Sequence, residues 1–200
     1  MWRFLQRCAY RLGKERYWYG PAETTKARAR RLREGFFEAY CQGSGLDIGH
    51  GGDPVVPGVR GWDLEDGDAQ YLRGVPDESF DFVYSSHTLE HMADARVALE
   101  RWWRVVKSGG YLILYVPDRE LYERRRKLPS RWNPDHKAFF LLDRDDPPHT
   151  IGLLPLAERA LRGGDIVYAR RCDEGYAVTD SDSPSLGEYS IELVARKAAE

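Results

Sequence analysis

The chain has 200 residues, of which 42% are hydrophobic and 31% charged, and its formal net charge is −2. This composition predicts one globular domain with a proper core, and it excludes a largely disordered chain. The near-neutral charge argues against a protein built for nucleic-acid binding. No apolar run approaches the roughly 20 residues of a membrane span.

The cysteines and the amino terminus point to a cytoplasmic protein. Cys8, Cys41 and Cys172 are widely spaced and odd in number, which favours reduced thiols over a disulfide framework or a zinc knuckle. The first residues lack the uninterrupted apolar stretch of a secretion signal.

Two helices are expected before residue 43. Apolar residues recur at helical spacing from Trp2 to Leu12, with basic residues on the other side. That helix could bind a membrane surface or a partner, although packing on its own domain is the preferred interpretation. Gly20 and Pro21 end it. Thr24 or Thr25 then begins a second helix, running to about Cys41, with a buried stripe of Leu32, Phe36, Phe37 and Tyr40.

Short apolar strands alternate with helices in the rest of the chain. This order predicts an α/β fold with a Rossmann-like, mostly parallel sheet and helices on both faces. Two late strands are expected to form an antiparallel pair at one edge, and residues 118–150 are expected to be irregular. The predicted strands are 46–48, 59–62, 80–85, 111–116, 166–170 and 190–194, and the later helices are 93–106 and 155–161.

A glycine-rich turn, residues 49–52, follows the first strand. Glycines there let the backbone approach a ligand closely. In a dinucleotide site a third glycine is required where this chain has Pro54. Only about ten residues separate Gly49 from Val59, too few for a crossover helix. We therefore expect a reduced first crossover helix, with no helix N-terminus for a pyrophosphate.

Five segments, taken together and in order, resemble class I S-adenosylmethionine-dependent methyltransferases of the type 11 subgroup. They are residues 46–52, 61–63, 67–69, 80–91 and 107–117. The resemblance covers residues 40–117 well and the remainder loosely. It implies S-adenosyl-L-methionine as the cofactor. It also implies one methyltransferase domain over 1–200, comprising N-terminal helices (1–42), a cofactor-binding core (43–117), a substrate-side insert (118–150) and a C-terminal helix and strand pair (151–200).

The carboxylates after the second strand match the family's adenosine contacts. One carboxylate can accept hydrogen bonds from both ribose hydroxyls, and the resemblance gives that role to Asp63. Asp68 and the backbone of Ala69 would contact the adenine, and Trp62 or Leu64 could cover one of its faces. Clustered acids could instead bind a hard cation, but a solvated turn is the commoner case.

The resemblance also implies contacts to the methionine part of the cofactor. Asp47 would help to hold its amine, and the glycines of the turn would lie against it. His50 could contact the cofactor as well, although we assign it no catalytic role. The methionine-side residues expected are Asp47, Gly49, His50, Gly51, Ser85 and Ser86.

Residues 87–91 formally match the inverted zinc-protease pattern H-x-x-E-H. That motif requires a long helix, whereas here the strand 80–85 runs almost directly into it. The same letters occur in type 11 methyltransferases, where Glu90 and His91 would fix the turn. We therefore expect no metal.

Methyl transfer depends mainly on alignment, because the sulfonium already makes the methyl group electrophilic. A hydroxyl acceptor would benefit from a general base, for which His136 and His87 are the candidates. The basic residues between Arg119 and Arg131 could bind phosphates or form a solvated face.

The resemblance favours O-methylation of a small molecule or saccharide. A non-catalytic methyltransferase-like binding module is the alternative. A homo-oligomer is possible, and the sequence does not name the acceptor.

Overall fold

The computed structural model describes residues 22–199. The amphipathic helix expected between Trp2 and Leu12 therefore lies outside the described residues. Within them, no helix is long and apolar enough to cross a membrane.

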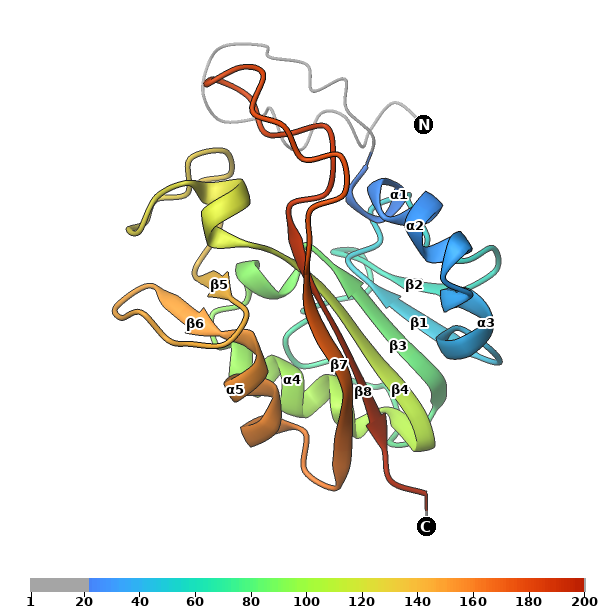
Figure 1. Ribbon diagram of the computed structural model, residues 1–200. Coiled ribbons are helices and arrows are strands. Elements are labelled where there is room, and N and C mark those ends of the chain that lie inside the picture. Colours follow the sequence, from blue (N-terminus) through green and yellow to red (C-terminus); the bar gives the residue numbers. More distant parts are fainter. Residues whose placement is uncertain (1–21, 200) are drawn as a thin grey trace.

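A six-stranded sheet forms the centre of the molecule (Figure 1), with strand order β2-β1-β3-β4-β8-β7. The first four strands of this order run parallel, and β8 is antiparallel to both of its neighbours. The mostly parallel sheet with an antiparallel edge pair is thus confirmed. The strands are β1 (Gly45–Ile48), β2 (Arg60–Trp62), β3 (Phe80–Ser86), β4 (Val106–Pro117), β7 (Gly164–Cys172) and β8 (Ser190–Lys197).

Helices cover both faces of this sheet. On one face, Phe36 of α3 packs against Phe82 and Tyr84 of β3. The intervening Val83 packs on the other face among residues of α4 and α5. Asp94 begins α4 by accepting hydrogen bonds from two backbone N–H groups of its first turn. The helices are α1 (Glu23–Lys26), α2 (Arg28–Arg33), α3 (Phe36–Tyr40), α4 (Ala95–Arg104) and α5 (Leu153–Ala160).

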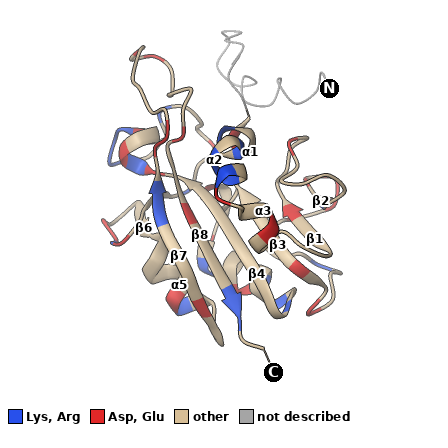
Figure 2. Ribbon diagram, turned by 45° about the vertical axis from the view of Figure 1, so that its right-hand side comes forward, with Lys and Arg blue, Asp and Glu red and all other residues tan. Residues whose placement is uncertain are grey.

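The single helix expected over 24–41 is instead three short ones. Gly35 takes a left-handed conformation between α2 and α3. Leu32, expected in the buried stripe, is 57% exposed, whereas Arg31 is completely buried. A guanidinium nitrogen of Arg31 lies 2.7 Å from Glu192 of β8, and its planar group lies over the ring of Tyr84. Ion pairing thus turns α2 by one residue, and the basic residues of α2 colour its ribbon blue in Figure 2.

Residues 49–59, between β1 and β2, form turns without a helix. The reduced first crossover helix is therefore confirmed. The Gly49 N–H donates to the carbonyl of Trp62, so the turn is tied to the end of β2.

Residues 118–150 are more ordered than the sequence indicated. A π-helix, η2 (Arg119–Glu123), follows β4 directly. Two short strands, β5 (Phe139–Leu141) and β6 (Thr150–Gly152), pair in parallel beside the main sheet (Figure 1). The expectation of an irregular segment was wrong for these parts.

Candidate active site

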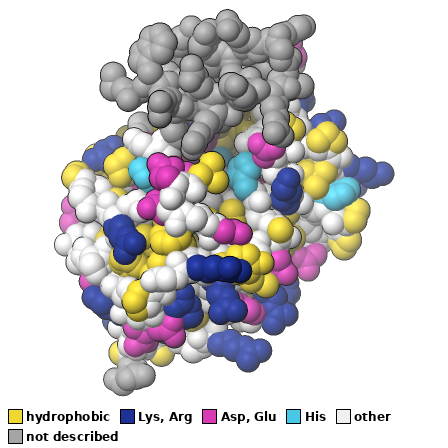
Figure 3. All heavy atoms as spheres, turned by 180° about the vertical axis from the view of Figure 1, so that it is seen from behind, with side chains coloured by type: hydrophobic (Ala, Val, Ile, Leu, Met, Phe, Trp, Pro, Cys, Tyr) yellow, Lys and Arg dark blue, Asp and Glu magenta, His cyan; other side chains and the backbone are white. Residues whose placement is uncertain are grey.

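The predicted site residues lie at or beyond the carboxyl ends of β1, β2, β3 and β4 (upper end in Figure 1). The histidines that reach the rear surface in Figure 3 lie in its upper half, at this same end. A hollow of about 500 Å³ lies at the opposite end, where Gly45, Arg60 and Phe80 begin three strands. None of the predicted site residues lines it.

Unpartnered polar atoms gather where β1 and β3 end. Asp47 is completely buried, and its Oδ2 accepts a hydrogen bond of 2.8 Å from the Val55 N–H. Its Oδ1 has no hydrogen-bond partner, nor do the Oγ atoms of Ser85 and Ser86. Buried polar atoms without partners are rare, because each one costs free energy. Burial also raises the pKa of Asp47 to about 7. These three side chains fit a ligand that brings polar groups of its own.

The glycine turn has the backbone conformation that its sequence suggested. Gly49 and Gly51 have φ angles of +72° and +54°, where side chains are disfavoured. A Cβ on Gly49 would overlap the side chain of Thr88. His50 accepts a hydrogen bond of 3.0 Å from the Gly52 N–H, and its ring lies against Gly61 of β2. This contact positions the β1–β2 turn.

The proposed adenosine contacts continue from β2 in a turn. Because β1 and β2 pair in parallel with Ile48 opposite Trp62, Asp63 lies beside the glycine turn. Its Oδ1 accepts from the N–H of Leu64, whose side chain is 75% exposed. Asp68 is exposed, and the Ala69 carbonyl accepts a hydrogen bond from Trp102. Asp63 is therefore half-buried beside the glycine turn, whereas Asp68 and the Leu64 side chain are exposed.

His87 occupies a strained position between β3 and η1 (Leu89–His91). Its φ is +49°, and its Nε2 lies 2.8 Å from Ser190 Oγ. The rings of Tyr115, Tyr122 and Tyr189 surround it at centroid distances of 5.8–6.0 Å. Burial, followed by the nearby Lys26 charge, lowers the pKa of His87 well below its usual value. A neutral imidazole thus lies within an aromatic wall.

His136 is also buried, and its Nδ1 lies 2.6 Å from Glu123 Oε1. The other oxygen of Glu123 accepts hydrogen bonds from Ser130 Oγ and the Arg131 N–H. A carboxylate held in this way orients the imidazole and fixes its tautomer. This dyad is the arrangement expected of a general base with its orienting partner.

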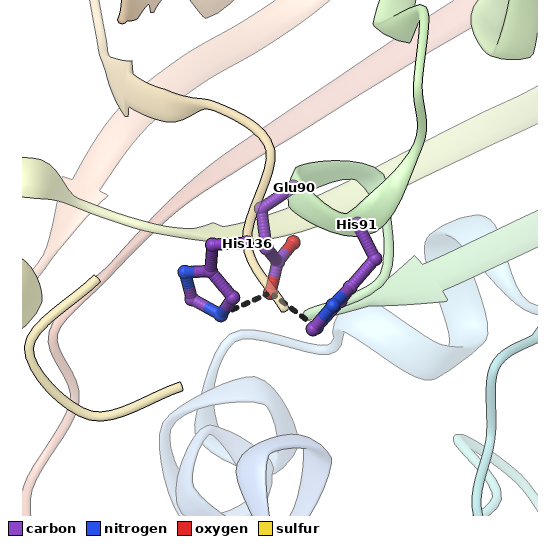
Figure 4. A group of neighbouring side chains, drawn as sticks. All are labelled: Glu90, His91 and His136. Carbon is purple, nitrogen blue, oxygen red and sulfur yellow. Dashed lines mark ion pairs between the residues drawn. The ribbon is translucent and has the colours of Figure 1, made fainter. Parts of the chain in front are cut away.

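Glu90 lies between histidines but forms no side-chain hydrogen bond (Figure 4). Its Oε1 is 3.8 Å from His87 Nδ1 and 3.9 Å from both His91 Nε2 and His136 Nε2. Burial raises the pKa of Glu90 to about 7, and burial lowers the pKa of His91 to about 4. At neutral pH the group therefore contains a largely neutral His91 and a partly protonated carboxyl.

Sequence reasoning did not find two acids of this site. Glu123 stands in a charged segment without any motif, and only the bend of η2 brings it to His136. For Glu90, the family resemblance implied only a residue that fixes a turn. Its backbone carbonyl does accept the Lys137 N–H, while its side chain points into the histidine cluster.

The basic stretch after β4 is partly used within the protein. Arg119 is buried, and its guanidinium lies 2.6 Å from an Asp146 oxygen. Arg124 and Arg131 donate hydrogen bonds to backbone carbonyls of Ser183 and Ser181. By contrast, the side chain of Arg126 is 81% exposed. Two of these arginines, Arg124 and Arg131, therefore hold the insert to the β7–β8 connection.

Comparisons with known proteins agree with this fold. Residues 38–114 match the family model described as a methyltransferase domain. A putative methyltransferase from Bacillus halodurans is 15% identical, with a TM-score of 0.52 over 86% of this chain and 98% of that one. A possible histamine N-methyltransferase from Thermotoga maritima is 20% identical, with a TM-score of 0.51 over 87% and 98%.

A chain from the complex of the Haloferax volcanii Trm112 activator with a putative methyltransferase is also similar. It is 16% identical, with a TM-score of 0.53 over 90% of this chain and 98% of that one. No curated protein matches the sequence.

The sheet and the matched segment define a class I methyltransferase, an enzyme class that takes its methyl group from S-adenosylmethionine. The match covers residues 38–114, the part of the chain whose motifs resemble the type 11 subgroup.

Proposed function

We propose that this enzyme transfers the methyl group of S-adenosylmethionine to a hydroxyl oxygen of a small molecule or saccharide. The observation that carries the proposal is the buried His136–Glu123 pair, with Nδ1 and Oε1 2.6 Å apart, beyond the end of β4. In open α/β sheets, ligands bind at the carboxyl ends of strands, which is where this pair lies. A hydroxyl needs a proton acceptor, whereas an amine that is already neutral does not.

The proposed cofactor contacts begin with the unpartnered atoms. Asp47 Oδ1 would accept from the methionine ammonium, and Ser85 and Ser86 would contact the same end of the molecule. The positive-φ backbone of Gly49 and Gly51 would lie against the cofactor. His50 acts here by holding the turn.

At the other end of the cofactor, Asp63 would accept from both ribose hydroxyls. Asp68, the Ala69 backbone and the exposed side chain of Leu64 would surround the adenine. Leu64, whose side chain is 75% exposed, would lose its exposed apolar surface on binding.

On the acceptor side, His136 would take the proton through Nε2, because Glu123 engages its Nδ1. His87 is the second catalytic candidate. Its lowered pKa makes it a weak base, so we assign it the task of contacting the acceptor within the wall of tyrosines. Aromatic faces of this kind pack well against sugar or other partly apolar rings.

Two measurements test this function. Isothermal titration with S-adenosylhomocysteine should show one site per chain, and loss of that site in the Asp63→Ala variant would support the proposed ribose contact. A tritiated-methyl assay against metabolite and glycan pools should then label an acceptor whose new bond is an ether. Label found only on nitrogen, carbon or sulfur would contradict O-methylation while leaving the enzyme class intact.

A further inference from the structure

Three side chains from two separate segments converge beyond β3 (Figure 4). Glu90 and His91 belong to η1, and His136 comes from the segment that follows η2. One ligand atom from each side chain lies within 4.8 Å of the other two. The two imidazole rings stand nearly perpendicular, with centroids 4.8 Å apart, so that they flank the carboxylate from different directions.

The side-chain oxygens of Glu90 can accept hydrogen bonds that the protein does not supply. The residue is completely buried, and neither side-chain oxygen has a hydrogen-bond partner. A buried carboxyl in that state is energetically unfavourable unless something binds it. The imidazole nitrogens at 3.9 Å are too distant for hydrogen bonds. A metal ion could bridge the Glu90 oxygen and these nitrogens, whereas a shared proton could not.

The contacts around His136 are those of a metal ligand. Its Nδ1 faces Glu123, and Glu123 is itself held by Ser130 and the Arg131 backbone. With the Nδ1 proton donated to a carboxylate, the lone pair of Nε2 points toward Glu90. Metal-binding histidines commonly have this carboxylate partner, which orients the ring and strengthens it as a ligand.

We propose that Glu90, His91 and His136 bind one divalent first-row transition metal ion, with Zn²⁺ the best match. Two histidines and a glutamate are an established zinc ligand set, and three protein ligands leave a fourth position open. At metal–ligand distances near 2.1 Å, tetrahedral ligand atoms lie about 3.4 Å apart. The glutamate–histidine distances of 3.9 Å therefore need to close by about 0.5 Å. His91 has the freedom to move, because its side chain is 29% exposed.

This ligand set differs from the H-x-x-E-H pattern considered from the sequence. That pattern would use both His87 and His91, whereas His87 bonds to Ser190 and stands outside the group. The described cysteines are poor competitors for the ion. Cys41 and Cys172 are buried, and burial raises the pKa of each thiol to about 12.

The site goes beyond the proposed function, and it uses one of the same atoms. A metal on His136 Nε2 occupies the lone pair that would otherwise accept the acceptor's proton. An acceptor hydroxyl bound at the open fourth position would become more acidic and would lose its proton to water instead of to His136, a step that rests on the proposed function. Metal binding itself does not depend on that step, so the two can be tested separately.

The experiment uses the full chain, freed of metal with a chelator and dialysed. Zn²⁺ is titrated by calorimetry, and Co²⁺ by visible absorption. We expect one ion per chain and the intense visible bands of four-coordinate cobalt. His91→Ala and Glu90→Gln should each weaken Zn²⁺ binding at least about 100-fold, and Glu123→Gln about 10- to 100-fold. His149→Ala is the matched control, because His149 lies outside the group and should leave binding unchanged.

Failure of the metal site can be distinguished from failure of the proposed function. Absence of binding, or binding unaffected by His91→Ala, would overturn the metal site. A thiolate-to-cobalt charge-transfer band would place the ion on a cysteine and would also overturn it. If Glu90→Gln does not fold, as judged by circular dichroism, the less buried His91 variant decides alone. S-adenosylhomocysteine binding in the metal-free protein tests the methyltransferase function independently.

Discussion

The imidazole of His136 and the carboxylate of Glu123 form a buried pair, with Nδ1 and Oε1 2.6 Å apart, just beyond the end of β4. Glu123 makes two further hydrogen bonds, so its position does not depend on the histidine. The pair therefore resembles a base whose orientation is fixed before a substrate arrives.

Removing the base should affect turnover and not cofactor binding. We expect His136→Ala to lower kcat about 100- to 10,000-fold, since that is the usual contribution of a general base. The dissociation constant for S-adenosylhomocysteine, measured by calorimetry, should change less than about 2-fold. A variant that loses cofactor affinity together with turnover would show that His136 is structural.

Much of the core could be predicted from the sequence because its signals are local. The apolar run of β3 indicated a strand buried on both faces, and the short, proline-containing link after Gly49 left no room for a helix. Each of these inferences depended on residues close together in the chain, where periodicity and length are informative.

The parts that sequence missed depend on distant partners. Arg31 is buried because Glu192, far along the chain, lies beneath it, and this pairing displaced Leu32 from the core. Likewise, nothing near Glu123 indicated that η2 would turn it toward His136. Whether a polar side chain is buried depends on its partner, and composition and periodicity do not reveal that partner.

Asp47→Asn should weaken cofactor binding in a pH-dependent way. Loss of a charged hydrogen bond predicts a 10- to 100-fold higher dissociation constant for S-adenosylmethionine at pH 8. Because burial raises the pKa of Asp47 to about 7, wild-type affinity should fall as the pH drops from 8 to 6. The Asn variant should lose that dependence, and calorimetry at several pH values checks both.

The raised pKa of Asp47 also affects the stability of the folded protein, and stability should change with pH in the opposite direction to cofactor affinity. A carboxyl whose folded pKa exceeds its unfolded value is more favourably buried when protonated. The contribution of Asp47 to stability should therefore decrease as the pH rises from about 4 to 7. Without ligand, Asp47→Asn should be at least as stable as wild type at pH 8 in urea unfolding. A markedly less stable variant would mean that the ionised carboxylate supports the fold.

Gly49→Ala should damage the glycine turn more than an equivalent change nearby. Both Gly49 and Gly58 have positive φ, and both lie between β1 and β2. Gly58→Ala, with open space around its Cβ position, should cost only the backbone strain of about 1–2 kcal/mol. Gly49→Ala adds an overlap with Thr88, worth about 1–3 kcal/mol more, and should abolish cofactor binding. Equal losses of unfolding free energy in the two variants, measured with urea, would contradict the importance of the close approach between Gly49 and Thr88.

Arg31 and Arg33 offer a test of buried against exposed ion pairing within one helix. Both side chains pair with a glutamate, but the Arg31–Glu192 pair is completely buried, whereas Arg33 and Glu174 are 59% and 50% exposed. Arg31→Ala leaves a buried carboxylate partly uncompensated, which predicts a loss of about 3–5 kcal/mol in the free energy of unfolding. Arg33→Ala should cost less than about 1 kcal/mol.

The loss of unfolding free energy in Arg31→Ala should also depend on pH. Although burial alone would raise the pKa of Glu192, Arg31 and Arg30 together lower it to about 2. Its stabilising contribution is therefore present above the unfolded value near 4.3 and is lost as the pH falls toward 2. In Arg31→Ala that acid-induced loss should shrink, because one of the two compensating charges is gone. If the wild type and Arg31→Ala lose equal free energy of unfolding between pH 7 and pH 3, the stabilisation does not come from this pair.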